Sequence, residues 1–358
     1  MKVSPSEPFK IVYSILNHEY LGYIFEAFVV QLTSQGDFSF QVQNISSKNS
    51  KEFRSGLDTK DFELVKLIDD IQQDAVLKKY NPKKLNAVDF FLKVYDPQKG
   101  DKVIQETIAS YIENCKSRIL DRLAGKDIFI MGNDGNPLWK PVTWEPEKAT
   151  IRFHFIRNDN THYFPTIRHN MQKLEFQYKN AFLICEDPAW LVLDGHLYHF
   201  EGNVDGKKIK PFLAKKFIAI PGQVEEQYYG RFVAPLIASY DVVARGFEIR
   251  NVSSVPKTIL TISEYSSNPK KSAVLFQDNE EVEVMEEEDN DVAFELSFQY
   301  AGFSFHYDSF AHASSVHMEK KGNEYFFNKV KRNIEVEGQH VRILKDLGLN
   351  IRNGKVQM

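Results

Sequence analysis

The amino-acid sequence predicts an α+β fold with mostly antiparallel sheets and segregated helices, in two or three subdomains. Strand-like and helix-like segments come in blocks along the chain and do not alternate one for one, which argues against a parallel α/β sheet. The chain has 358 residues, and domains of about 150 residues are typical, so two or three units are expected. Its 28 Phe and 16 Tyr also favour sheets, because aromatic residues are enriched in strands.

Residues 1–126 predict a strand meander followed by three helices. Strand-like stretches fill most of 9–43, and turn residues at 17–19 and 34–37 separate them. Apolar residues then recur at helical spacing over 57–80, in the segment AVDFFLKVY, and in a longer run that begins at Asp101. This part of the chain is expected to form the first subdomain.

Residues 127–320 predict a mixed, β-rich subdomain with one helix. The helix is expected around 224–240, and Pro235 should kink or break it because proline lacks the amide hydrogen. Strand-like patterns follow near 242–250, 258–265 and 292–307. The acidic run at 278–291 holds nine acidic residues and no basic one, which favours a solvated loop whose first part could pair as a strand.

Residues 321–358 predict a helical connector. Basic residues outnumber acidic ones between Glu324 and Leu349, whereas the chain as a whole is acidic, with a formal net charge of −4. Apolar residues are also more numerous here than one short amphipathic helix face needs. We therefore expect this segment to be ordered chiefly by a partner that lies beyond it.

The segment Arg152–His169 alternates aromatic and basic residues on both sides of a turn. Phe153 and Phe155 have the same parity, so both should face one side of a strand. The sequence NDNT at 158–161 is typical of a turn, and Pro165 on the return strand favours an edge position or a strand end, so a hairpin at a sheet edge is expected. Two interpretations remain open for this predicted hairpin: a core of aromatic residues with solvated arginines, or a surface that binds a partner directly.

A second basic segment lies between residues 207 and 216. It holds five lysines and no acidic residue; Phe212 lies among the lysines and Phe217 follows the last of them. Positive charge beside aromatic rings suits a nucleic-acid backbone or a single-stranded groove. The alternative is a solvated strand edge that lysines protect from pairing.

Catalytic motifs are not apparent in the sequence. A phosphate-binding loop needs glycines followed by Lys and a hydroxyl residue, and neither Gly125-Lys126-Asp127 nor Gly206-Lys207-Lys208 fits this pattern. The nearest approach to a metal cluster is Asp194, His196, His199 and Glu201, but two histidines three apart would face opposite sides of a strand. No catalytic residue, metal or cofactor is therefore expected.

The two cysteines, Cys115 and Cys185, are too few for a disulfide framework, which suggests a reducing compartment. The N-terminal segment lacks an apolar signal core, and no apolar window approaches about 18 residues. We therefore expect a cytoplasmic protein with no membrane partner.

Four segments together resemble the N-terminal region of a bacterial group of Swi/Snf-type helicases, found in Bacteroidetes-like organisms. They are IVYSILNHEYLGYIFEAFVVQL, GKDIFIMGNDGNPLWKP, the stretch from RNDNTHYFPTIRH to FLAKKFIAIP, and RFVAPLIASYDVVARGFEIR. In that group the region precedes a two-lobed ATPase motor that moves on duplex DNA. This sequence has no Walker A loop and no DExH box, so the resemblance implies an accessory region without the motor.

The resemblance implies a non-catalytic, helicase-associated module that contacts DNA, the motor domains in cis or in trans, or both. On this interpretation the chain alone is not an enzyme, whereas its full-length relative would be an ATP-dependent translocase. The alternative is a stand-alone protein-interaction scaffold that binds no nucleic acid. The residues expected to contact nucleic acid are Arg152, Arg157, His162, Tyr163, Arg168, Lys207, Lys208, Lys210, Lys215 and Lys216.

Overall fold

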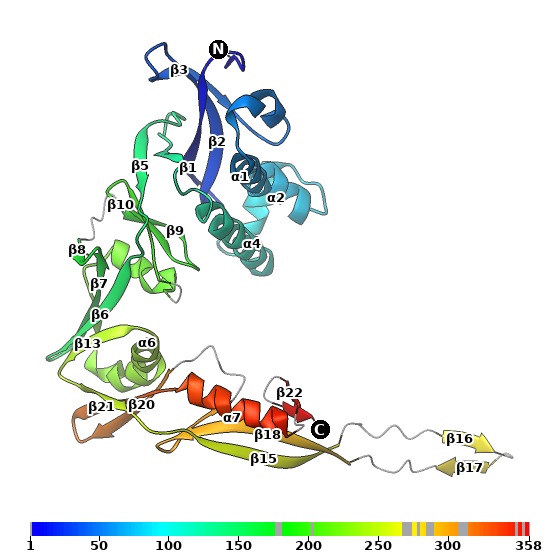
Figure 1. Ribbon diagram of the computed structural model, residues 1–358, viewed down its shortest axis with the longest axis vertical. Helices are drawn as coiled ribbons and strands as arrows, with labels where there is room; N and C mark the ends of the chain where they lie inside the picture. Colours follow the sequence, from blue (N-terminus) through cyan, green and yellow to red (C-terminus); the bar gives the residue numbers. More distant parts are fainter. Residues whose placement is uncertain are drawn as a thin grey trace. The chain divides into compact units, whose positions relative to one another are not determined.

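The computed structural model describes residues 2–175, 181–201, 204–266, 274–277, 280–283, 290–306, 314–347, 350–352 and 355–357 (Figure 1). Helices and mostly antiparallel or mixed sheets confirm the predicted α+β class. The chain divides into two compact units, Met1–Phe153 with Phe164–Ile218 and His154–Tyr163 with Ala219–Met358. This division differs from the boundaries expected near 126 and 320, because strands on both sides of each boundary pair with one another.

The first unit begins with the predicted meander, which is confirmed. Strands β1 (Phe9–His18), β2 (Gly22–Leu32) and β3 (Phe38–Asn44) pair antiparallel in sequence order. Strand β4 (Asp127–Ile130) then pairs parallel with β1 on its other side. The meander and the segment after residue 126 therefore belong to one sheet.

The same sheet continues through strands from later in the chain. Its order is β3-β2-β1-β4-β5-β11-β10-β9. The added strands are β5 (Lys140–Trp144), β9 (Ala181–Cys185), β10 (Trp190–Leu193) and β11 (His196–His199). Asp194 and Gly195 join β10 to β11 with φ values of 51° and 81°, as the predicted two-residue hairpin turn requires.

Four α-helices follow the meander where three were predicted. They are α1 (Thr59–Asp70), α2 (Gln73–Tyr80), α3 (Ala87–Val94) and α4 (Lys102–Leu120), and a 3₁₀ segment (η1, Ser50–Gly56) precedes them. The single helix expected over 57–80 is broken at Gln72, whose backbone is extended. Its side-chain amide donates to the carbonyl oxygen of Phe25 at 2.8 Å, so a contact with β2 fixes the break.

The helices cover only one face of the meander. Alternate residues of β1 point to opposite faces, so Tyr13 and Ile15 pack with the helices while Val12 lies in a separate apolar cluster. Figure 1 shows α1 and α4 beside β1 and β2. The smaller cluster, formed with Phe28 and Val30, occupies the sheet face that the helices leave uncovered.

The predicted hairpin of 152–169 is present, but it does not lie at a sheet edge. Strands β6 (Thr150–Arg157) and β7 (Thr161–His169) occupy the middle of the order β12-β7-β6-β13. Strands β12 (Ile218–Ile220) and β13 (Asp241–Arg245) flank them, and β8 (Gln172–Leu174) also pairs with β7. Strand β8 pairs with residues 167–169 of β7, beyond Pro165.

The helix predicted over 224–240 is present in three parts. It consists of α5 (Glu225–Tyr228), a π-helical turn (η5, Tyr229–Val233) and α6 (Ala234–Ser239). Pro235 lies in the first turn of α6, where a missing amide hydrogen is tolerated. The π-helical turn before Pro235 is wider than an α-helical turn and accommodates the proline ring. The kink or break that was predicted at Pro235 is therefore present as this irregular turn.

The rest of the second unit is mostly strand. One sheet has the order β14-β21-β20, with β14 (Glu248–Val252), β20 (Ser314–Lys321) and β21 (Glu324–Lys331). A second contains β15 (Lys257–Ser266), β18 (Asn290–Tyr300), β19 (Phe303–His306), β22 (Asn350–Arg352) and β23 (Lys355–Gln357). Strands β16 (Val274–Gln277) and β17 (Glu280–Glu283) pair with each other, so the first part of the acidic run forms a strand, and residues 284–289 lie outside the described residues.

The prediction of a helical connector over 321–358 is wrong for its first part and for its last described residues. Residues 324–331 form β21, which pairs on both sides with β14 and β20, and residues 350–352 and 355–357 form β22 and β23. Between them Ile334–Asp346 is helical, as α7. Tyr325, Phe327 and Val330 are buried. Aromatic and β-branched residues in a sheet with two partners favour the strand over the helix.

Candidate nucleic-acid interface

The lysine segment, residues 206–217, is irregular but firmly anchored in the first unit. Two 3₁₀ turns, η2 (Gly206–Lys208) and η3 (Lys210–Leu213), form most of it, and the carboxylate of Asp205 accepts the amide of Lys207 at 2.8 Å. The alternative prediction, a solvated strand edge protected by lysines, is therefore wrong, because the lysines of this segment precede the short strand β12. Ile209 and Phe212 are buried and fix the segment to the unit.

Gly206 explains why the anchored segment packs so closely against the unit. A Cβ at this position would lie 2.8 Å from Leu183 and 3.0 Å from the Cα of Glu186. Only glycine fits without displacing the neighbouring backbone. The lysines are thus presented by a segment whose path is set by packing, which lowers the entropy lost when they bind a partner.

The lysines project outward from these anchors. Lys207, Lys210, Lys215 and Lys216 are exposed, and Lys208 is half-buried. The Nζ atom of Lys210 lies 2.7 Å from Glu186 Oε1, an exposed ion pair of the kind that contributes little to stability. Phe217 follows the last lysine and is 50% exposed, so an aromatic ring lies beside the charges.

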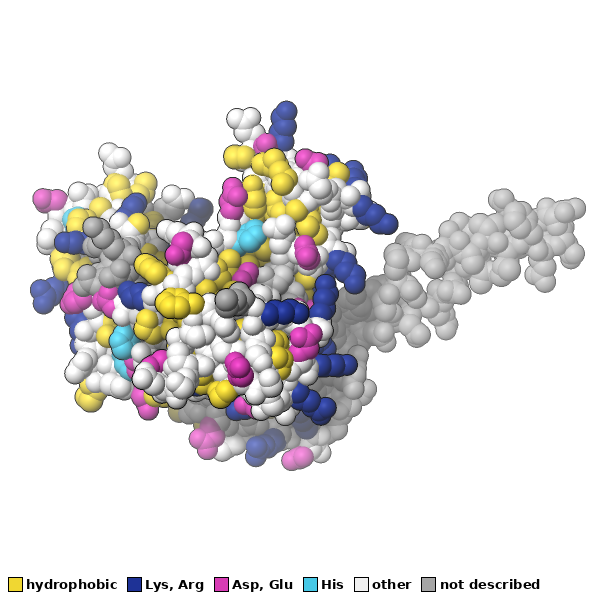
Figure 2. All heavy atoms as spheres, turned by 90° about the horizontal axis from the view of Figure 1, so that it is seen from above, with side chains coloured by type: hydrophobic (Ala, Val, Ile, Leu, Met, Phe, Trp, Pro, Cys, Tyr) yellow, Lys and Arg dark blue, Asp and Glu magenta, His cyan; other side chains and the backbone are white. Residues whose placement is uncertain are grey.

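Figure 2 shows the distribution of charged side chains on one face of the molecule. Lys and Arg side chains gather along one edge of this face, whereas acidic and basic side chains mix over the rest. The net charge of the chain is −4. Any attraction for a polyanion must therefore come from local clusters such as the lysine segment.

The aromatic residues of the 152–169 hairpin belong to the core. Phe153 and Phe155 are fully buried, as their shared parity predicted. In the second unit the ring of Phe155 stacks on that of Tyr163 with centroids 5.1 Å apart. Tyr163 is only 3% exposed, and its hydroxyl lies 2.9 Å from that of Tyr228, so this predicted contact residue faces the interior.

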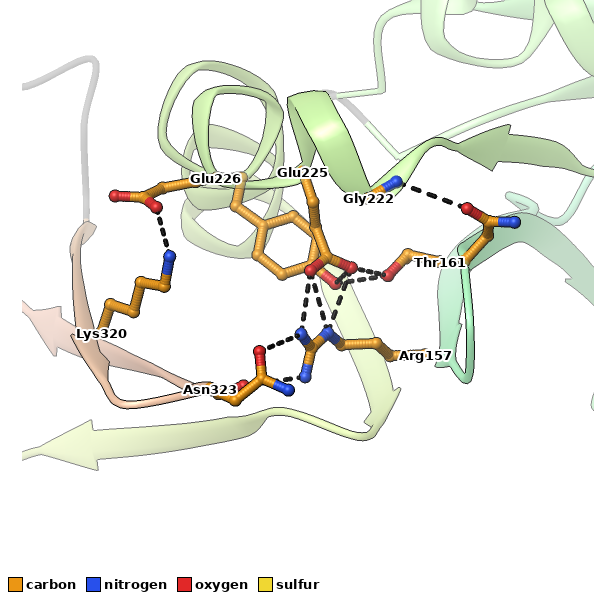
Figure 3. Close-up of polar contacts among 9 residues, drawn as sticks. Arg157, Thr161, Gly222, Glu225, Glu226, Lys320 and Asn323 are labelled. Carbon is orange, nitrogen blue, oxygen red and sulfur yellow. Dashed lines mark hydrogen bonds and ion pairs between the residues drawn. The ribbon is translucent and has the colours of Figure 1, made fainter.

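Arg157, another predicted contact residue, is engaged inside the second unit (Figure 3). Its Nε donates to both carboxylate oxygens of Glu225 at 3.1 and 3.0 Å, and Nη1 donates to the carbonyl oxygen of Asn323 at 3.0 Å. The hydroxyl of Thr161 donates to the same carboxylate at 2.6 Å. Arg157 therefore ties the hairpin turn to α5 and to the turn between β20 and β21.

The other predicted hairpin residues differ in exposure. Arg152 and His162 are half-buried, and Arg168 is exposed near the end of β7. The structure thus places Tyr163 in the interior, engages the partly buried Arg157 with Glu225 and Asn323, and leaves Arg168 exposed. Of the ten predicted residues, those on the lysine segment form the group that is both clustered in sequence and largely exposed.

The Arg157–Glu225 network is expected to make the free energy of unfolding depend on pH. Burial alone would raise the pKa of Glu225, but the hydrogen bonds from Arg157 and Thr161 outweigh burial and lower this pKa. The network therefore stabilises the fold above the unfolded-state pKa, and this contribution is lost as the pH falls through the folded-state pKa. In denaturant unfolding, Glu225→Gln should be less stable than the wild type at pH 7, and the difference should shrink below about pH 4.

Glu226→Gln is the matched control for this prediction. Glu226 is the next residue on the same helix, but its ion pair with Lys320 is exposed, with side chains 58% and 39% accessible. Exposed pairs contribute about 0–1 kcal/mol, so this variant should match the wild type at every pH. Equal stability losses in the two variants would contradict the account of the network.

The histidines considered as metal ligands contact neighbouring protein side chains. His196 Nδ1 lies 2.6 Å from Glu145 Oε1, and the ring of His199 stacks on those of Trp190 and Trp144. Burial lowers the pKa of His199. Within the described ranges no group of three or more His, Cys, Asp or Glu side chains could hold a metal ion.

Both cysteines are buried, and burial raises the pKa of each thiol. A thiol reacts through its thiolate form, so raised pKa values make these cysteines poor nucleophiles. Among the helices of the described residues, none is long and apolar enough to cross a membrane.

Comparison with known proteins yields no family model, no curated protein and no solved structure that matches the chain. The resemblance to the N-terminal region of Swi/Snf-type helicases stays a prediction that these comparisons do not test.

Sequence reasoning missed the partners of Arg157. Glu225 lies 68 residues from Arg157, and Asn323 lies 166 residues away. No local period links residues at such separations, so the sequence offered no signal for the pairing. An arginine beside a turn is as compatible with a solvated side chain as with a buried ion pair, and only the tertiary fold decides.

Proposed function

We propose that this chain is a non-catalytic nucleic-acid-binding module that acts as the accessory region of a Swi/Snf-type DNA translocase. The observation that supports this proposal is the lysine segment, in which exposed Lys207, Lys215 and Lys216 lie on a backbone anchored by Ile209 and Phe212. Lysine ammonium groups contact phosphate as point charges, and their binding releases counterions. The resemblance supplies the expected partner, a DNA-translocating motor.

The DNA ligand should be held through its backbone. Lysines that contact phosphates carry no sequence information, so affinity should be similar for duplexes of different sequence. Phe217 offers one exposed ring beside the charges, which could stack on a base only where a strand is unpaired. Duplex, forked and single-stranded DNA are therefore the ligands to compare.

Replacing Lys207, Lys208, Lys210, Lys215 and Lys216 by glutamine is expected to weaken DNA binding by at least about tenfold at low salt, because phosphate contacts dominate non-specific affinity. Fluorescence anisotropy with labelled duplex, forked and single-stranded DNA measures the effect. Circular dichroism should show an unchanged fold, since the anchors Ile209 and Phe212 remain.

A matched control removes five positive charges elsewhere in the first unit. It replaces the following exposed lysines by glutamine: Lys78, Lys83, Lys84, Lys93 and Lys99. The control should bind DNA nearly as tightly as the wild type if the lysine segment is the contact. Equal weakening in both variants would reduce the effect to net charge, and no binding by the wild type would favour the protein-interaction scaffold.

A further inference from the structure

A pocket of about 300 Å³ lies beside α4 in the first unit. This volume is at the lower end of the range of small-molecule sites. Tyr20 and Leu21 of the β1–β2 turn and Tyr95 at the end of α3 form part of its lining. The other lining residues recur at helical spacing and so share one face of α4: Gln105, Glu106, Ala109, Ile112, Glu113 and Lys116.

The tyrosine rings of the pocket are held in place by a third ring. Tyr20 stacks on the buried Phe91 with ring centroids 5.1 Å apart, and the ring of Tyr95 lies 5.5 Å from that of Tyr20. Both tyrosines are half-buried, so part of each side chain remains outside this packing. Two fixed tyrosine rings favour a cation, because the face of an aromatic ring carries negative charge density.

One ion pair in the pocket is already satisfied by the protein. The side chain of Lys116 is only 6% exposed, and its Nζ donates to Glu113 Oε1 at 2.9 Å and to the carbonyl oxygen of Ile184 at 3.1 Å. The other carboxylate oxygen of Glu113 accepts the amide of Glu186 at 2.7 Å. The charges of Lys116 and Glu113 therefore balance each other, and β9 and the residue after it hold both side chains.

Glu106 supplies the charge that is not balanced. It is exposed, and within the described ranges no ion pair or hydrogen bond engages its carboxylate. Two glutamates and one lysine give the lining a net charge of −1. The amide nitrogen of Gln105 donates to the carbonyl oxygen of Val94 at 2.6 Å, which leaves the side-chain carbonyl oxygen of Gln105 to accept a further hydrogen bond. The pocket therefore offers acceptors and negative charge beside aromatic rings.

We propose that this pocket binds a guanidinium group, carried by free arginine or by an arginine side chain of a partner. A guanidinium ion is planar, always charged and less strongly hydrated than an ammonium ion, so it is well suited to stacking on tyrosine rings. Two of its five N–H donors can bind the Glu106 carboxylate side by side, and others can reach the carbonyl oxygen of Gln105. The pocket shares no residue with the lysine segment, so the assignment does not depend on DNA binding.

Isothermal titration calorimetry with L-arginine tests the proposal. One molecule should bind per chain, and citrulline should bind at least about tenfold more weakly, because it keeps the shape of arginine without the charge. Glu106→Gln should weaken arginine binding about tenfold, since it removes one charged hydrogen-bonding partner. Glu52→Gln is the matched control, because Glu52 is exposed in the same unit and lies outside the pocket.

Filling the pocket gives a second test that leaves every charge in place. Ala109→Phe adds a ring at an exposed position of the lining and should abolish arginine binding. Ser110→Phe adds the same ring at the next position of α4, which is exposed but outside the lining, and should bind arginine as the wild type does. Circular dichroism should show the same fold for both variants.

N-acetylarginine amide distinguishes the two sources of the guanidinium group. Tighter binding of free arginine indicates an amino-acid ligand, whereas equal or tighter binding of the capped compound indicates the side chain of a partner, and both results support the site. The proposal is overturned if neither compound binds saturably, if citrulline binds as tightly as arginine, or if Glu106→Gln and Glu52→Gln bind alike. Unchanged binding by Ala109→Phe would also overturn it.

Discussion

Phe155→Ala is expected to lower the free energy of unfolding by about 3–5 kcal/mol, the usual range for removing a fully buried phenylalanine ring. Phe155 is 0% exposed, and its ring contacts those of Tyr163 and Phe247 at centroid distances of 5.1 and 5.7 Å. Its removal leaves a cavity that these rings can fill only in part. Denaturant unfolding followed by circular dichroism should show a lower midpoint with an unchanged slope.

Phe217→Ala is the control for this prediction. Phe217 is half-exposed, and its loss should change the free energy of unfolding by no more than about 0.5 kcal/mol, as for most surface positions. The two variants separate a core role from a surface role for the aromatic residues near the basic segments. A Phe155→Ala variant as stable as Phe217→Ala would contradict the core assignment of the hairpin.

Glu337→Ala is expected to have a comparable effect, about 3–5 kcal/mol, because it removes one partner of a buried ion pair. Glu337 on α7 faces Arg332, and the two side chains are 1% and 0% exposed. The hydroxyl of Tyr300 on β18 donates to the same carboxylate at 2.5 Å. The variant therefore leaves the Arg332 charge buried without this carboxylate.

Glu335→Ala provides the matched control on the same helix turn, where Glu335 is exposed and should contribute little. The double variant Arg332→Met/Glu337→Leu should regain much of the lost stability, since well-packed apolar residues often replace a buried pair. Hydrogen exchange should also show the α7 amides losing protection in Glu337→Ala. An unchanged stability in Glu337→Ala would contradict the view that α7 is an integral part of the second unit.

The elements that were predictable from the sequence are those with a strong local period. Strands β1 and β2 were predictable because turn residues separate their strand-like stretches. The shared parity of Phe153 and Phe155 follows directly from the two-residue repeat of a strand. The turn at Asp194-Gly195 was also predictable, because these residues tolerate the positive φ values that the hairpin needs.

The features that were not predictable depend on contacts between distant residues. The sequence of β21, EYFFNKVK, spaces its apolar residues in a way that suits a helix as well as a strand, and pairing with β14 and β20 decides between them. The break at Gln72 depends on a hydrogen bond to Phe25, 47 residues away. Composition indicated the lysine segment, whereas its anchoring by Ile209 and Phe212 and the engagement of Arg157 appear only in the fold.

The dependence of duplex-DNA binding on salt tests the central proposal most directly. The logarithm of the binding constant should fall linearly with the logarithm of the salt concentration, with a slope of about −0.9 for each phosphate contact. The five-lysine variant should show a shallower slope than the wild type, by up to about 0.9 for each lysine that contacts a phosphate. Identical slopes for the two proteins would contradict the proposal that the lysine segment holds the DNA backbone.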